Sequence, residues 1–164
     1  MGHFAQAQNP LLLTSKDDAS LRIADTSNFT ITSTNTLTAS GSTINGVTGM
    51  AIHPCTDSIY LMLKIASQSG RSLATTDTNG NVTIIGNTGD NFAEIAFDNN
   101  GVLYGITGDG ATNSERLYTI SLTNASITQV VVLGNGDDGE TIAYSPDDGF
   151  MYHWSGNGTT VFER

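Results

Sequence analysis

The stretch "FAEIAFDNNGVLYGITGDG", residues 92–110, decides the fold because the chain contains it more than once. Residues 139–156 read "GETIAYSPDDGFMYHWSG", and residues 48–62 read "TGMAIHPCTDSIYLM". Each copy has an apolar segment, a turn rich in Asn, Asp, Gly or Pro, and a second apolar segment that contains Tyr. Self-similarity at a fixed spacing of about 20 to 50 residues is the signature of a repeat architecture.

The three copies align on one Ala and one Tyr each, and the aligned Ala residues are 45 and 47 residues apart. Gly101 and Gly149 lie in the turns between the aligned Ala and Tyr of their copies and can adopt the positive φ that tight turns require. We therefore predict an antiparallel hairpin in every copy, with the small Ala on the strand nearest the axis of the molecule. The aligned residues are Ala51, Ala96 and Ala143, and Tyr60, Tyr104 and Tyr152.

Two more predicted strands follow each hairpin. The third strand of the repeat is visible as "SLRIADT", "RSLATTD", "ERLYTIS" and "TTVFER", and the fourth begins after an Asn-containing turn. No stretch of about a dozen residues keeps the apolar spacing of a helix. Four antiparallel strands in about 45 residues form one blade of a β-propeller, so the sequence predicts an all-β propeller, complete or incomplete.

The predicted strands do not divide into whole blades. Residues 1–10 form an N-terminal segment, and residues 11–164 supply three, four, four and three strands, which makes two full and two incomplete blades. A closed propeller typically has about four to eight blades. Two explanations stay open: the chain is part of a longer propeller, or incomplete blades from several chains complete one another. Head-to-tail pairing that does not close would instead give a filament.

The repeat resembles a known class of propellers. The pattern "IAFDNNGVLYGIT" followed by "RLYTISLTNASITQVVVLG" is similar to blades of the NHL and YVTN-type propellers. That resemblance covers residues 11–164 and implies a ring of four-stranded blades. It leaves the function open, because such propellers serve in ligand binding, adhesion, scaffolding and in some cases catalysis.

Charge and composition exclude several classes of partner. The formal net charge is −10, although only 13% of the residues are charged. An acidic surface repels phosphate backbones and anionic lipids, so we expect neither nucleic acid nor a membrane surface as partner. No apolar run approaches the roughly 20 residues that cross a bilayer. Ala5-Gln6-Ala7 fits the small-x-small pattern before a signal-peptidase cleavage site, which favours a secreted or cell-surface protein over a chance tripeptide.

Acidic residues gather in the loops that enter the predicted inner strands, "GNTGDNFAE" at 86–94 and "GNGDDGE" at 134–140. Carboxylates that converge near a propeller axis would suit Ca²⁺, which takes about six to eight oxygen ligands. The other interpretation is ordinary turn chemistry, since Asp and Gly are common turn residues. The candidate metal ligands are Asp90, Asp137 and Asp138, and the wider candidate ligand-binding set adds Glu94, Glu140 and Trp154.

Other residue types are weaker candidates. Trp154 is two residues from Tyr152, so the two share one face of a strand, where they would pack between blades or form a platform for a sugar. His53, Cys55 and His153 lack the spacing of a zinc site and are expected to be ordinary side chains. Four Asn-x-Ser/Thr sequons are candidate glycosylation sites, although turn geometry also accounts for the three that share one position in the repeat: Asn28, Asn81, Asn124 and Asn157.

These features predict a non-catalytic, extracellular or cell-surface propeller that acts in ligand binding, adhesion or assembly. Its partners would be further copies of itself, missing blades of the same protein, or a protein or carbohydrate ligand. One alternative is a self-assembling subunit of an extracellular polymer. Another is a propeller-based hydrolase or lyase with acidic residues at the mouth of the channel, which the aligned Asp90 and Asp137 support.

Overall fold

The computed structural model describes residues 10–134, 140–156 and 160–164, and within these ranges it contains fourteen strands and no helix. The first sheet holds β1 (Leu11–Ser15), β2 (Asp18–Ala24) and β3 (Ile31–Thr36). The second holds β4 (Ile44–Ile52), β5 (Ile59–Ile65), β6 (Ser72–Thr76) and β7 (Val82–Asn87). The third holds β8 (Phe92–Phe97), β9 (Leu103–Thr107), β10 (Arg116–Ile120) and β11 (Ile127–Val132). The fourth holds β12 (Thr141–Tyr144), β13 (Met151–Ser155) and β14 (Val161–Glu163).

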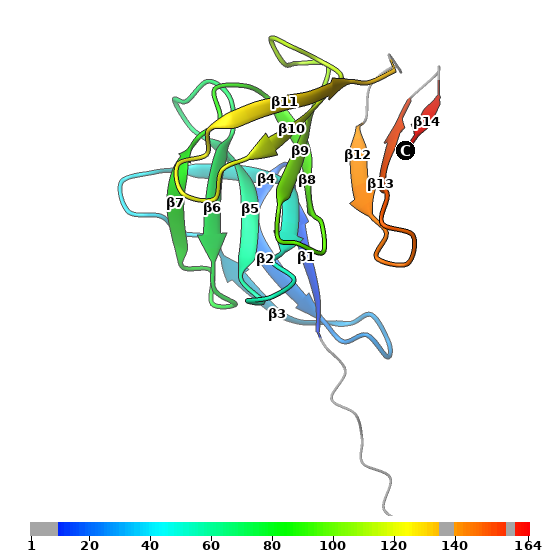
Figure 1. Ribbon diagram of the computed structural model, residues 1–164. Helices are drawn as coiled ribbons and strands as arrows, with labels where there is room; N and C mark the ends of the chain where they lie inside the picture. The colour runs from blue at the N-terminus through cyan, green and yellow to red at the C-terminus, as the bar shows by residue number, and fades with distance from the viewer. Residues whose placement is uncertain (1–9, 135–139, 157–159) are drawn as a thin grey trace, which may run out of the picture.

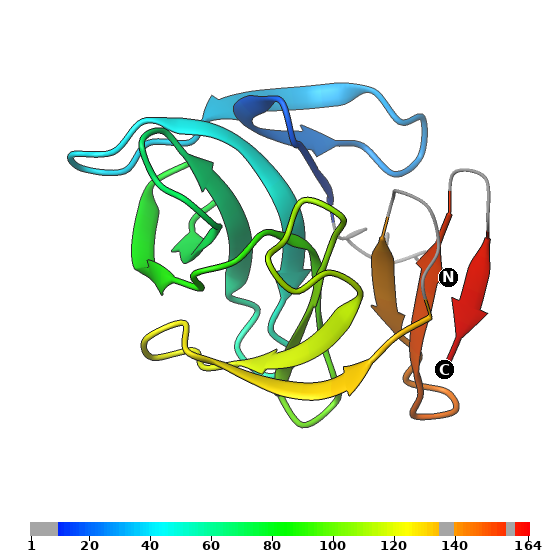
Figure 2. The same ribbon diagram turned by 90° about the horizontal axis from the view of Figure 1, so that it is seen from above.

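Every sheet is an antiparallel meander of consecutive strands, and the sheets stand around a common centre as the blades of a propeller (Figures 1 and 2). Strands β4, β8 and β12 are the inner strands: β4 packs against β8, and β8 packs against β12. The first sheet packs against β4 through β1 and β2. The all-β propeller fold predicted from the repeat is therefore confirmed.

The repeated stretch forms the predicted hairpins in register. Ala51 pairs with Tyr60 on the neighbouring strand, and the corresponding pairs are Ala96 with Tyr104 and Ala143 with Tyr152. The residue three positions before each Tyr has a positive φ: 56° at Asp57, 78° at Gly101 and 76° at Gly149. Short polar residues and Gly tolerate this left-handed conformation, which is why the turns are rich in Asp, Asn and Gly.

Three apolar clusters join neighbouring blades. The cluster between the first and second sheets includes Leu21, Leu61 and Leu63, and the one between the second and third sheets includes Met62, Leu73 and Phe92. Between the third and fourth sheets, the buried residues are Ile106, Leu117 and Ile142. Among the described residues, no strand of the first sheet contacts a strand of the fourth, so the ring is open between these two blades.

Candidate functional site

Asp90 fixes a loop at one end of the third blade. Its side chain is buried, and its carboxylate oxygens accept hydrogen bonds from the backbone N–H groups of Thr112 at 2.7 Å and Asn113 at 3.1 Å. The backbone N–H of Asn91 donates a third hydrogen bond at 2.9 Å. Thr112 and Asn113 lie in the connection between β9 and β10, so Asp90 holds that connection against the segment that enters β8.

The same connection supplies two members of an acidic cluster. Asp109 and Glu115 lie in it, and Glu140 directly precedes β12 in the next blade. One carboxylate oxygen from each of the three residues lies within 4.8 Å of the others. Asp109 is exposed, whereas Glu115 is 4% and Glu140 9% exposed. The cluster thus bridges the third and fourth blades and opens to solvent on the Asp109 side.

The acidic cluster is short of hydrogen-bond donors. Among the described residues, no N–H or hydroxyl group donates a hydrogen bond to either carboxylate oxygen of Glu115, and Oε1 of Glu140 accepts a hydrogen bond from the Ser155 hydroxyl at 3.1 Å. Burial, reinforced by the neighbouring carboxyls of Glu140 and Asp109, raises the pKa of Glu115 to about 8. The ionised form of Glu115 is therefore costly unless a positive charge joins the cluster.

The structure separates the candidate ligands predicted from the sequence. Glu140 belongs to the acidic cluster, Asp90 binds backbone N–H groups nearby, and Glu94 lies in the channel between the inner strands. The predicted ligands Asp137 and Asp138 fall outside the described residues. Asp109 and Glu115 were not among the predicted residues.

Hairpin geometry could have pointed to those two residues. In an antiparallel meander, the end of the second strand and the start of the third lie at the same end of the sheet as the start of the first. The connection from 108 to 115, which contains Gly-Asp-Gly and a Glu, must therefore lie beside the loop that carries Asp90.

Glu94 is the notable ionisable group of the channel. It lines a cavity of about 380 Å³ between the inner strands, together with Ala51, Ala96 and Ala143. Its Oε1 accepts a hydrogen bond from the backbone N–H of Ile95 at 3.1 Å. Burial raises the pKa of Glu94 to about 6, partly offset by backbone hydrogen bonds. The small Ala residues at the repeated position thus leave space along the axis, and the Glu94 carboxyl lies in this space.

Replacing Glu94 with Gln is expected to stabilise the protein at pH 8 by up to roughly 2 kcal/mol, the equivalent of a pKa raised to about 6. The pKa of Glu94 is higher in the folded protein than in the unfolded chain, so its protonated form favours folding. This contribution to the free energy of unfolding is fully present below pH about 4.5 and is lost as the pH rises through about 6. The difference between variant and wild type should therefore grow between pH 5 and pH 8. Urea unfolding followed by circular dichroism measures it, and a difference that does not change with pH would contradict this interpretation.

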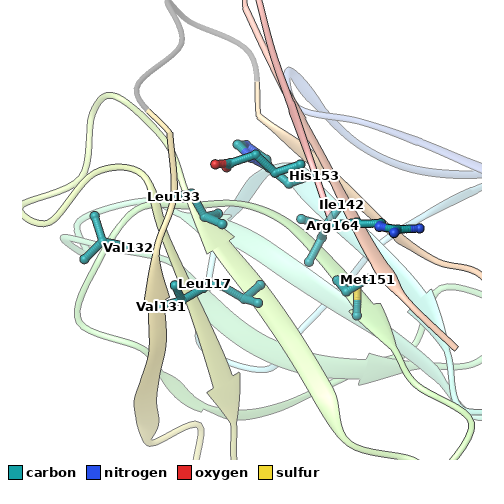
Figure 3. Close-up of a pocket in the computed structure, with 9 residues that line it drawn as sticks. Leu117, Val131, Val132, Leu133, Ile142, Met151, His153 and Arg164 are labelled. Atoms are coloured by element: carbon teal, nitrogen blue, oxygen red, sulfur yellow. The ribbon is translucent and has the colours of Figure 1, made fainter.

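A second cavity, of about 250 Å³, lies between the third and fourth blades (Figure 3). Apolar side chains from both blades line it, among them Leu117, Ile142 and Met151. At one side, Nδ1 of the buried His153 is 3.2 Å from Oε2 of Glu163. The backbone N–H of Gly134 donates a hydrogen bond to the same oxygen at 2.9 Å, and this hydrogen bond is the main reason that the pKa of Glu163 is lowered.

Trp154 lies on the opposite side of the fourth sheet, on a face that no other described strand covers. It shares this face with Tyr152 and Phe162: the Tyr152 and Phe162 rings stack at 5.7 Å, and Trp154 meets Phe162 edge-on at 5.9 Å. Trp154 is 56% and Phe162 62% exposed. We call Tyr152, Trp154 and Phe162 the open aromatic face.

Asn28 and Asn124 lie in exposed turns, and the exposed Asn81 follows a turn and forms a β-bridge with Thr38. Oδ1 of Asn28 accepts a hydrogen bond from the backbone N–H of Thr30, and Oδ1 of Asn124 accepts one from Ser126. These bonds are those of ordinary Asx turns. Glycosylation at these positions stays a prediction, and Asn157 lies outside the described residues.

Comparison with solved structures finds the same fold in other proteins. One chain from the crystal structure of a nidogen/laminin complex aligns over 90% of this chain with a TM-score of 0.62 and 15% identity. Hydrazine synthase of Kuenenia stuttgartiensis aligns over 88% with a TM-score of 0.56 and 14% identity. This chain spans 53% and 39% of those two chains, respectively. At such identities the likeness shows the fold alone.

No protein-family model and no curated protein matches the sequence. Within the described residues, no helix has the length and apolar character needed to pass through a membrane.

Proposed function

We propose that this chain is a non-catalytic propeller module for binding and assembly, secreted or presented at a cell surface, whose end blades pack against the blades of a second copy. The observation that carries the proposal is the open aromatic face of the fourth sheet. Contiguous exposed aromatic surface of this kind marks an interaction site in a soluble protein.

The position of the open aromatic face in the repeat supports a blade as its occupant. Tyr60 packs into the cluster between the second and third sheets, and Tyr104 packs into the cluster between the third and fourth. Tyr152 is the equivalent residue of the fourth sheet. The open aromatic face is therefore the surface that, in the two preceding blades, contacts the next blade.

The first sheet offers an apolar surface for the other side of such a contact. Leu12 and Leu21 pack towards the second sheet, whereas Leu11, Leu13 and Ile31 are exposed. Leu11 pairs with Ala24, and Ala24 pairs with Ile31, so Leu11 and Ile31 share a face. If the fourth sheet of each copy packed against the first sheet of the other, the two copies would close one ring of about eight blades, within the usual size of a propeller.

The fold neighbours are consistent with this arrangement. The nidogen/laminin chain is almost twice as long as the part that this chain covers, since the alignment spans 53% of it. That chain comes from the structure of a nidogen/laminin complex. A propeller of this fold can therefore serve protein binding, which is the role proposed here.

Light scattering after size-exclusion chromatography tests the proposal. We expect a mass of about twice the 17.2 kDa of one chain. Replacing Phe162 with Asp should give a monomer, because a charge would be buried in the contact. Emission of Trp154, the single Trp of the chain, should move to longer wavelength in that variant, because dissociation exposes the indole to water.

Val130→Asp is the matched control, because Val130 is an exposed apolar residue on β11, a strand of the third sheet and of neither end sheet. This variant should remain a dimer. A folded wild-type monomer at all concentrations would refute assembly through a second copy, and a mass that grows with concentration would indicate the open filament instead.

A further inference from the structure

Glu115 presents a physical problem that the proposed assembly does not solve. Its side chain is 4% exposed, and no N–H or hydroxyl group of the described residues donates to either of its carboxylate oxygens. Buried polar atoms in folded proteins are almost always paired, and a buried charge needs a partner of opposite sign. The unpaired oxygens face the carboxyls of Asp109 and Glu140, which add negative charge.

Within the described residues, no basic side chain forms an ion pair with this cluster. The ion pairs found there join Arg22 to Asp18, Lys64 to Asp17 and His153 to Glu163. The guanidinium of Arg116, the residue next to Glu115, instead donates to Gln129 at 2.7 Å. The Ser155 hydroxyl donates a hydrogen bond to Glu140, but this donor carries no charge.

The dimensions of the cluster fit a hard divalent cation. Two oxygens on opposite sides of a Ca²⁺ ion, each bonded at about 2.4 Å, are at most about 4.8 Å apart. Oxygens of Asp109, Glu115 and Glu140 all lie within 4.8 Å of one another. Carboxylates alone, without imidazole or thiolate, select the Ca²⁺ and Mg²⁺ class over zinc or copper.

The backbone of the loop at Gly108 lies close to the Glu140 carboxylate. A Cβ at Gly108 would lie 3.0 Å from Oε2 of Glu140, so Gly at this position allows the carboxylate to lie against the loop. Asp90 fixes the same loop through Thr112 and Asn113, which places both loop carboxylates before any ligand binds. The exposed Asp109 leaves an entry from solvent.

We propose that Asp109, Glu115 and Glu140 bind one divalent cation, with Ca²⁺ the ion that fits best, and that this ion joins the third blade to the fourth. Of these three residues, only Glu140 was in the ligand-binding set predicted from the sequence, and Asp90, predicted as a metal ligand, instead positions the loop. The assignment is independent of whether the chain assembles with a second copy.

Calorimetric titration of the metal-free full chain with CaCl₂ at pH 8 tests the site. We expect one ion per chain, and a melting temperature by circular dichroism that rises by about 5 to 10 °C when free Ca²⁺ is about 100-fold above its dissociation constant. EGTA should reverse the rise. Absence of both heat and thermal shift up to millimolar Ca²⁺ would overturn the proposal.

Variants separate the site from general charge effects. Glu115→Gln should abolish the Ca²⁺-dependent rise while raising the melting temperature of the metal-free chain, because it removes repulsion. Asp109→Asn, at an exposed position that folding tolerates, should weaken Ca²⁺ binding by about tenfold or more. Glu94→Gln is the matched control, since Glu94 is a largely buried Glu outside the cluster, and its Ca²⁺ response should equal that of the wild type.

A cluster that merely shares a proton among its carboxyls would give no Ca²⁺ response in the wild type. An undiminished response in both Glu115→Gln and Asp109→Asn would place any bound ion elsewhere and would refute this assignment.

Discussion

Replacing Asp90 with Ala is expected to lower the free energy of unfolding by about 3 to 5 kcal/mol. The substitution removes a buried carboxylate that accepts hydrogen bonds from the backbone of Asn91, Thr112 and Asn113. Each charge-assisted hydrogen bond contributes about 1.5 to 3 kcal/mol, and the donors left behind are partly buried. Urea unfolding monitored by circular dichroism measures the loss.

Asp98→Ala is the control for Asp90→Ala. The Asp98 carboxylate also accepts hydrogen bonds from two backbone N–H groups, those of Asn100 and Val102, but in an exposed turn. Water can replace that acceptor, so we expect a loss of only about 1 kcal/mol. Hydrogen exchange should show loss of protection at the Thr112 and Asn113 amides in Asp90→Ala alone. Equal losses in the two variants would mean that Asp90 is only an ordinary turn residue.

Replacing Phe92 with Ala is expected to cost about 3 to 5 kcal/mol through lost burial and the cavity that remains. Phe92 is fully buried in the cluster between the second and third sheets. Its ring meets Tyr118 edge-on at 5.5 Å and lies against the backbone of Gly105, where a Cβ would be 2.7 Å from the ring.

The matched control is Phe29→Ala. Phe29 is 73% exposed in the turn between β2 and β3, and Ala would retain its positive φ of 57° with similar strain. We expect a change within about 0.5 kcal/mol. The denaturant dependence of the free energy should be unchanged in both variants, because the surface exposed on unfolding is nearly the same. A small effect of Phe92→Ala would show that the contact between these blades is not tightly packed.

The propeller fold was predictable because its determinants are local. The period of the repeat sets the blade, and the Ala–Tyr alignment predicts hairpins whose cross-strand pairs the structure contains, such as Ala96 with Tyr104. The turn residues Gly101 and Gly149 have the positive φ expected from their type. Each of these inferences needs only neighbouring strands and the preferences of single residues.

The acidic cluster was only partly predictable because it joins two blades. Glu140 was identified from its loop, but Asp109 and Glu115 come from a different connection, and their proximity depends on how the third blade packs against the fourth. Asp90 and Asp137 align in the repeat, yet the Asp90 carboxylate accepts hydrogen bonds from backbone N–H groups. Equivalent positions in a repeat share backbone geometry, whereas the partners of their side chains vary from blade to blade.

The open ring of a single chain also affects the order in which the blades unfold. Among the described residues, each blade contacts only its immediate neighbours, so cooperativity within one chain passes from one boundary to the next, as in a linear array. The boundary of the fourth blade is the weakest one described, with three buried apolar residues against nine at each of the others. In a monomer such as Phe162→Asp, where no second copy covers the fourth blade, local opening should therefore begin at that end. Trp154 belongs to the blade that frays first, so tryptophan fluorescence reports the detachment of one blade, whereas circular dichroism reports the melting of the remaining sheets.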